Sequence, residues 1–173
     1  MRVNADAMTL YAVTDRTWVK DTTLMDQVKE ALEGGITFLQ LREKHLSKEE
    51  FIKEAREMKE LSKEYKVPFV INDNIEVALA VDADGVHIGQ DDMSVEEARK
   101  LLGEDKIIGV SAHNVEEAIK AQKGGADYLG VGAVCATSTK KDANVVSKEE
   151  IKKICHTVEI PVSYTHLTLP TNS

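Results

Sequence analysis

Short apolar runs alternate with longer amphipathic segments along this chain, and this alternation most constrains what it can fold into. The apolar runs are rich in Val, Ile and Leu and are apolar on both faces, which is typical of parallel strands covered by helices. We therefore predict seven strands, at Thr9–Val13, Ile36–Leu41, Pro68–Ile71, Ala83–Ile88, Lys106–Val110, Asp127–Val131 and Glu159–Val162.

The segments between the predicted strands begin and end with helix signals. Ser47-Lys-Glu-Glu50 is a capping box, and similar starts recur at Ser94, Asn114 and Ser147. Glycine pairs follow two of the helical segments and lead directly into strands, at 34–35 and 124–125. Repeated βα units favour an α/β fold of the (β/α)₈ TIM-barrel type, and an open doubly wound sheet is the alternative.

The length of the chain limits how much of a barrel it can form. A complete eight-unit barrel needs at least about 200 residues, and this chain has 173. We expect six βα units and the start of a seventh within residues 1–162, forming a partial barrel. Residues 163–173 have no helical period and no charged residue, so we expect a disordered or foreign tail there.

Composition excludes several classes of function. A net charge of −8 argues against general nucleic-acid binding. No apolar stretch approaches the ~20 residues of a membrane span, and charged residues interrupt any signal peptide near the N-terminus. Cys135 and Cys155 lack metal-ligand spacing and suggest a reducing, cytoplasmic setting.

Polar residues gather where the predicted strands end, which is where parallel βα folds bind ligands. After the second strand, Gln40, Arg42 and Lys44 alternate and so point to one face. Arginine offers a planar fork and lysine a point charge to diphosphate oxygens. The same residues could instead be a solvated strand end with salt bridges.

Two acidic residues follow the third and fourth strands. Asp73 lies in Ile71-Asn-Asp-Asn74, and a loop after Ile88 could carry Asp92 toward it. Two carboxylates with water and a substrate phosphate suit Mg²⁺. Asn72 and Asp73 could equally be a helix N-cap.

Hydroxyls and a lysine complete this set of polar side chains. Ser111 ends the fifth strand, and the loop after the sixth carries Thr137, Ser138, Thr139 and Lys140, a composition suited to phosphate. His87 lies within an alternating predicted strand, so we expect it in or near the core. His113 precedes the Asn114 helix cap, so we expect it to be exposed. We expect no comparable polar set at the opposite strand ends, and this asymmetry predicts an active face.

Taken in order, these motifs resemble the thiamine-phosphate synthase family. The resemblance rests on Tyr11-Ala-Val-Thr-Asp15, Gln40-Leu-Arg-Glu-Lys44, Ile71-Asn-Asp-Asn74, the segment 84–92, Ile108-Gly-Val-Ser-Ala-His113 and the segment 137–143. It implies a Mg²⁺-dependent transferase that joins hydroxymethylpyrimidine diphosphate to thiazole monophosphate, releasing diphosphate and thiamine phosphate.

The resemblance also implies a role for each matching residue. Asp73 and Asp92 would bind Mg²⁺, and residues 137–139 would hold the thiazole phosphate. The pyrimidine diphosphate would be held by Gln40, Arg42, Lys44, Asn72, Ser111 and Lys140. Diphosphate would leave first and the thiazole nitrogen would attack a pyrimidine methyl cation, so no protein nucleophile is needed.

The chain departs from the family pattern at two places. Cys135-Ala136 stands where the family usually has Phe-Pro, and the glycine-rich and Val-Ser phosphate turns of the family's last two units are absent. Two other functions stay open: a thiazole tautomerase-like isomerase of similar fold, and a non-catalytic phosphate-binding barrel.

Overall fold

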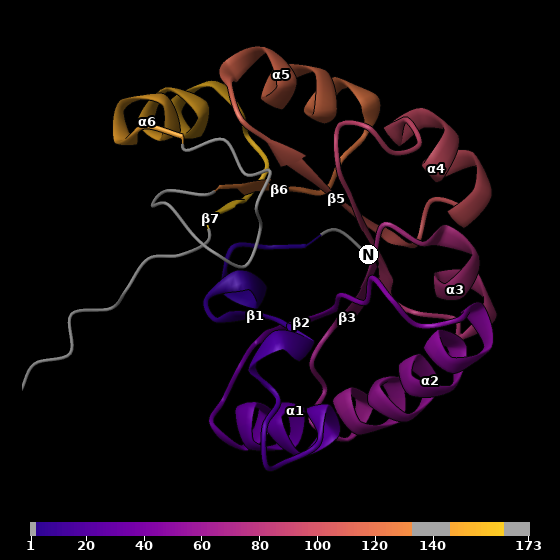
Figure 1. Cartoon of the computed structure of the whole chain (residues 1–173). Coiled ribbons are helices and arrows are strands. Elements are labelled where there is room, and N and C mark those ends of the chain that lie inside the picture. Colours follow the sequence, from indigo (N-terminus) through magenta and orange to yellow (C-terminus); the bar gives the residue numbers. More distant parts are fainter. Residues whose placement is uncertain (1–2, 133–145, 165–173) are drawn as a thin grey trace, which may run out of the picture.

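The computed structural model of the chain describes residues 3–132 and 146–164, which form a nearly closed barrel of parallel strands wrapped by helices (Figure 1). The seven strands of this part lie in sequence order, and every neighbouring pair is parallel. The predicted barrel-type α/β fold is confirmed. An open doubly wound sheet is excluded, because its strand order would reverse at a switch point.

The strands follow the apolar runs of the sequence. The first six begin and end within two residues of the predicted bounds, and the seventh begins three residues later than predicted. The strands are β1 (Tyr11–Val13), β2 (Phe38–Leu41), β3 (Phe69–Asn72), β4 (Gly85–Ile88), β5 (Ile107–Ala112), β6 (Tyr128–Val131) and β7 (Val162–Tyr164).

The later start of β7 has a local cause. The amides of Glu159 and Ile160 donate to the Gln122 side-chain oxygen rather than to a strand, at 2.6 and 3.2 Å. Pro161 has no N–H, but its carbonyl accepts from Leu129 N at 2.9 Å and so starts the pairing with β6. The strand then runs to Tyr164, two residues past the barrel boundary expected at residue 162.

The helices begin where the capping signals predicted. Ser47 and Ser94 form complete capping boxes, and Asn114 and Ser147 each accept the amide of the third helical residue. A further box, between Thr23 and Asp26, starts the first helix. The helices of the described part are α1 (Leu24–Glu33), α2 (Lys48–Glu64), α3 (Ile75–Ala80), α4 (Val95–Leu102), α5 (Val115–Gly124) and α6 (Lys148–Thr157), with short 3₁₀ turns η1 (Asp6–Met8) and η2 (Arg16–Trp18).

Side chains alternate between the inside of the barrel and the layer beneath the helices. The outward residues join one large apolar cluster with the helices. The inward residues Phe38, Val70, Ile107 and Tyr128 form a smaller interior cluster that also contacts Tyr11. Because strand side chains alternate with period two, Gln40, Asn72 and Ser111 face inward above this layer, toward the carboxyl ends of the strands.

The opposite end of the barrel also carries charged residues, so the expectation that it would lack a comparable polar set is wrong. Asp84 accepts the Phe69 amide at 2.8 Å, and Asp127 accepts the Ile108 amide at 2.9 Å. Asp127 also pairs with Arg99 at 2.7 Å, and Lys106 pairs with Asp82 at 2.5 Å. These charges are satisfied by partners within the fold.

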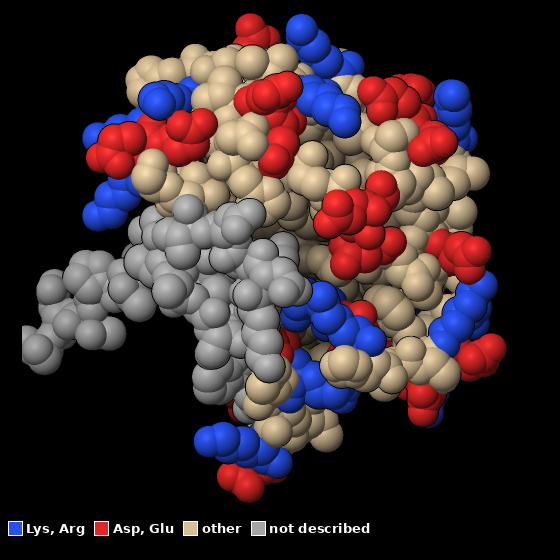
Figure 2. All heavy atoms as spheres, turned by 45° about the horizontal axis from the view of Figure 1, so that its top comes forward, with Lys and Arg blue, Asp and Glu red and all other residues tan. Residues whose placement is uncertain are grey.

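No broad surface of one sign covers the face drawn in Figure 2, where acidic and basic side chains are interspersed. On this face, any cations that hold an anionic ligand are therefore individual side chains and not part of a broad basic surface. Cys155 is exposed and unpaired, whereas Cys135 lies outside the described residues. Among residues 3–132 and 146–164, no helix combines the length and apolarity needed to cross a bilayer.

Candidate functional site

Polar residues from three successive strand ends meet at the carboxyl-terminal mouth of the barrel. The Asp73 carboxyl group, just after β3, interacts with Asp92 in the loop after β4. Its other charged and polar neighbours are Lys44, beyond β2, and Asn72, the last residue of β3. The expected convergence of Asp73 and Asp92 is therefore present in the fold.

The backbone at Asp73 adopts a conformation that few residues with side chains prefer. Its φ of 59° lies in the left-handed region. Its N–H donates to the His87 carbonyl at 2.8 Å, and the Asn74 N–H donates to the Asn72 carbonyl at 2.7 Å. The α3 cap is Asn74, whose side chain accepts from Val77 N at 2.9 Å. Asn72 and Asp73 are therefore not the cap residues, and the turn directs Asp73 into the mouth.

The acidic pair is electrostatically unfavourable as it stands. Partial burial of the Asp73 carboxyl, and then the nearby Asp92 carboxylate, raise the pKa of Asp73 to about 6. Asn72 and Lys44 act in the opposite direction but do not offset this. Asp92 is held in place by the Gly89 amide, which donates to it at 2.7 Å. Two carboxylates that repel each other at a strand-end mouth are a fitting donor set for a hard divalent cation.

A metal centre built from protein ligands alone is not what these residues offer. Within the described part of the chain, no group of three or more His, Cys, Asp or Glu side chains could hold a metal ion. Mg²⁺ commonly takes one or two carboxylates and completes its shell with water and substrate phosphate. The Asp73–Asp92 pair matches that mode of binding.

Arg42 and Gln40 are positioned by the segment after β1. Thr14 N donates to the Gln40 carbonyl at 3.0 Å, and Arg42 N donates to the Thr14 hydroxyl at 2.9 Å. The Arg42 guanidinium lies 4.0 Å from an Asp15 carboxylate oxygen. Asp15 in turn caps η2 by accepting from Thr17 N at 2.9 Å. Among the residues that the structure describes, the Arg42 guanidinium has one weak ionic partner, Asp15, so most of its donors can serve another anion.

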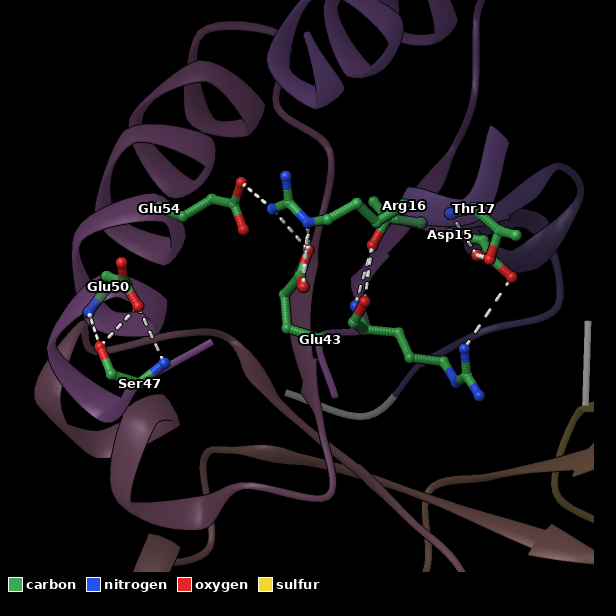
Figure 3. A network of polar contacts seen from close by, with 9 residues as sticks. Asp15, Arg16, Thr17, Glu43, Ser47, Glu50 and Glu54 are labelled. Atoms are coloured by element: carbon green, nitrogen blue, oxygen red, sulfur yellow. Dashed lines mark hydrogen bonds and ion pairs between the residues drawn. The ribbon is translucent and has the colours of Figure 1, made fainter. Parts of the chain in front are cut away.

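Glu43 stands in the sequence between Arg42 and Lys44, the two cations predicted to bind diphosphate, but its side chain points away from them. Figure 3 shows Arg16 between Glu43 and Glu54, with its Nη2 2.8 Å and 2.6 Å from their oxygens. The Glu43 side chain is only 4% exposed, so this ion pair ties the segment after β1 firmly to β2. Burial raises the pKa of Glu54, which shares Arg16 with Glu43. Arg16 and both glutamates were not anticipated, because their pairing links distant segments.

Ser111 lies at the end of β5 among polar neighbours. Its hydroxyl is 3.0 Å from His87 Nε2, and its carbonyl accepts from Gln90 Nε2 at 2.5 Å. His87 is 8% exposed and faces the barrel interior, which confirms the expected near-core position. His113 is half-buried and pairs with Glu117 at 2.9 Å. Gln90 and Asp92 also line a cavity of about 180 Å³ beside α5.

The remaining predicted site residues cannot be placed. Thr137, Ser138, Thr139 and Lys140 lie outside the described residues. The described members of the predicted site are Gln40, Arg42, Lys44, Asn72, Asp73, Asp92 and Ser111, and all lie at or just beyond carboxyl ends of strands.

The chain is similar to known proteins along most of its length. Residues 10–164 match the family model described as thiamine monophosphate synthase. The thiamine-phosphate synthase of Clostridium acetobutylicum is 55% identical over 153 residues, covering 88% of this chain and 72% of that protein. That of Clostridium tetani is 50% identical over 154 residues, covering 89% of this chain and 74% of that protein.

A solved structure extends the similarity to the fold. A thiamine phosphate pyrophosphorylase from Pyrococcus furiosus superposes with a TM-score of 0.84 at 41% identity. The match covers 92% of this chain and 75% of the archaeal one. At this identity the likeness extends beyond barrel architecture to the sequence as a whole.

Proposed function

Because the chain belongs to the thiamine monophosphate synthase family, we propose that it joins hydroxymethylpyrimidine diphosphate to thiazole monophosphate. The chain is an enzyme of the transferase class, in thiamine biosynthesis. One observation carries the choice of substrates. A basic residue, an amide and two carboxylates from successive strand ends gather in one mouth, at Lys44, Asn72, Asp73 and Asp92.

The first task of such a site is to stabilise a departing diphosphate. Arg42 and Lys44 follow β2 on the same side of the strand, and Arg42 retains donors that Asp15 does not engage. Preorganised cations lower the barrier most where charge develops in the transition state. The Arg16–Glu43–Glu54 ion pairs hold the connecting backbone, so we propose that they keep Arg42 and Lys44 in register with each other.

Magnesium is the second element of the proposal. Asp73 and Asp92 would hold the ion, because their mutual repulsion is relieved by a divalent cation. When bound, Mg²⁺ would neutralise charge that builds on the leaving diphosphate. Asn72 is positioned beside Asp73 to donate to a phosphate oxygen or to orient the carboxylate.

Bond formation would need no protein nucleophile. Departure of diphosphate leaves a pyrimidine methyl cation, and the thiazole nitrogen supplies the electron pair for the new C–N bond. The residues of the mouth then bind and orient both substrates: Gln40 and Ser111 from the barrel wall, and Lys140 with residues 137–139 from the loop outside the described part. Because the site holds the two substrates close and aligned, the reaction barrier no longer includes the entropic cost of bringing them together.

One assay tests this proposal against its alternatives. The chain is incubated with both substrates and Mg²⁺, and diphosphate and thiamine phosphate are measured together. Equal amounts of the two products, dependent on Mg²⁺, are the expected result. Conversion of a thiazole isomer without diphosphate release would indicate an isomerase. Binding of the substrates without any product would indicate a phosphate-binding barrel.

A further inference from the structure

A continuous chain of polar side chains crosses the barrel interior beneath the mouth. Gln40 Nε2 donates to the Tyr11 hydroxyl at 2.5 Å, and the Tyr11 and Tyr128 hydroxyls lie 2.6 Å apart. The Tyr128 hydroxyl is 3.0 Å from His87 Nδ1, and His87 Nε2 is 3.0 Å from the Ser111 hydroxyl. This interior chain joins Gln40 and Ser111, two predicted substrate-binding residues on β2 and β5, through three residues with no assigned role.

The barrel makes room for this chain with two glycines. A Cβ at Gly109 on β5 would clash with the Tyr128 ring, and a Cβ at Gly130 on β6 would lie 2.7 Å from His87 Cε1. Tyr128 is completely buried, and its ring packs edge-to-face against Phe38 and Tyr11. The Tyr11 and Tyr128 rings are therefore held in place by packing as well as by hydrogen bonds.

Every link in the chain needs one donor and one acceptor, and this restricts its direction. A neutral imidazole donates from one nitrogen and accepts at the other. If Tyr11 donates to Tyr128, then Tyr128 donates to His87 Nδ1, and His87 Nε2–H donates to Ser111. The Ser111 hydrogen is then left to donate into the mouth.

The opposite direction leaves a hydrogen without a partner. If His87 Nδ1–H donates to Tyr128 and Tyr128 to Tyr11, Tyr11 receives two donors, because Gln40 also donates to it. With the Gln40 amide nitrogen facing Tyr11, none of the hydrogen bonds of the described residues then gives the Tyr11 hydrogen an acceptor. Burying an unsatisfied hydroxyl is costly, which favours the first direction. Burial also raises the pKa of both phenols well above the usual range, so both remain donors.

We propose that Tyr128 is a positioning residue that fixes His87 as the Nε2–H tautomer and thereby presents Ser111 to the substrate as a hydrogen-bond donor. The proposal rests on the function proposed above for its substrate, since Ser111 would donate to an acceptor on the pyrimidine diphosphate. Tyr128 itself touches no substrate and acts only through His87 and Ser111.

The direct test is the tautomer of His87 in Tyr128→Phe. The ring ¹⁵N resonances of the wild-type chain are expected to show the Nε2–H tautomer, and Tyr128→Phe to lose that preference. Tyr65→Phe, which removes a hydroxyl from an exposed tyrosine, is the matched control and should leave His87 unchanged. A His87 tautomer unaffected by Tyr128→Phe would overturn the proposal. This measurement needs no substrate, so it stands if the proposed transferase activity is not found.

A double-mutant cycle separates positioning from general damage. Tyr128→Phe is expected to lower kcat/KM on the order of tenfold, the effect of losing one well-aligned hydrogen bond. In a Ser111→Ala background the same change should cost less than about twofold, because the group it positions is gone. Equal losses in both backgrounds would assign Tyr128 a structural role and overturn the proposal.

Tyr11→Phe provides a second variant if Tyr128→Phe does not fold. It removes the Tyr11 hydroxyl from the chain but leaves Tyr128, which Gln40 also approaches, able to donate to His87. The His87 tautomer is therefore expected to persist in Tyr11→Phe. A change of tautomer in that variant would reverse the assigned direction of the chain and refute the proposal.

Discussion

The two ends of the barrel both carry charged residues, but they use them differently. At the amino-terminal end of the strands, Asp127 accepts a strand amide and pairs with Arg99, whose side chain is only 15% exposed. At the carboxyl-terminal end, Asp73 and Asp92 are like charges side by side. The paired end holds the strands together, whereas the mouth keeps an electrostatic repulsion that a bound cation can relieve.

The largest difference between the ends should appear in activity. We expect Asp92→Ala to lower turnover by about 10²–10³-fold, because it removes a group proposed to stabilise charge on the leaving diphosphate. The midpoint of thermal unfolding should not fall, since a repulsive contact is lost. Turnover at a series of Mg²⁺ concentrations, with thermal melting of the same samples, measures both effects. Asp91→Ala removes the neighbouring exposed carboxylate and is the control; equal losses in the two variants would remove Asp92 from the site.

The reverse outcome is expected at the paired end. Asp127→Ala removes the carboxylate that pairs with Arg99 and accepts the Ile108 amide, and we expect the free energy of unfolding to fall by about 2–3 kcal/mol. For a chain of this size the melting midpoint would drop by roughly 4–12 °C. Turnover measured well below that midpoint should change less than about twofold. Glu104→Ala, a substitution at an exposed residue nearby, is the control and should change neither the melting midpoint nor turnover. A large loss of turnover in Asp127→Ala would contradict the comparison between the two ends.

Much of this arrangement follows from local sequence patterns. Strands of Val, Ile and Leu, serine caps and glycine stops are short-range signals, so they placed six strands and four helix starts closely. The mouth was predictable for a related reason. Because the strands are parallel, the residues that follow them meet at one end, so the sequence alone predicts that Asp73 and Asp92 lie together.

The rest depends on contacts between segments that are far apart in sequence. Tyr11 and Tyr128 are separated by 117 positions, and their hydroxyl contact requires the barrel to curve until β1 faces β6. Arg16 similarly forms an ion pair with Glu54, which lies 38 positions further along the sequence. The start of β7 depends on a Gln122 side chain that accepts two backbone amides. No local hydrophobic period or sequence motif indicates such pairings between distant segments.

A smaller effect concerns how the stability of the mouth depends on pH. The pKa of Asp73 is raised from 3.8 to about 6, so between these values the folded state binds more protons than the unfolded state. Stability of the metal-free protein should therefore fall as pH rises through this window. The Asp73 residue as a whole is exposed although its carboxyl group is partly enclosed by its neighbours, so solvent screening limits the effect to about 1 kcal/mol.

Asp73→Asn isolates that contribution, because asparagine tolerates positive φ and cannot ionise. Urea unfolding with a chelator present should find the variant more stable than the wild type at pH 7 and equal to it near pH 4. Added Mg²⁺ should stabilise the wild type at pH 7 and affect the variant less. A variant that is less stable than the wild type at pH 7 would mean that Asp73 is favourably paired, contrary to the comparison.

The smallest expected effect tests whether ion pairing stabilises this barrel regardless of burial. Lys48 and Glu76 form an ion pair between α2 and α3, but their side chains are 52% and 72% exposed. Such pairs contribute little, because water and salt screen the charges and two long side chains must be ordered. Glu76→Gln should therefore change the free energy of unfolding by less than about 0.5 kcal/mol, and 1 M salt should remove most of that difference. A loss as large as that in Asp127→Ala would show that pairing stabilises this barrel regardless of burial, and the distinction between its two ends would then rest on like charge at the mouth alone.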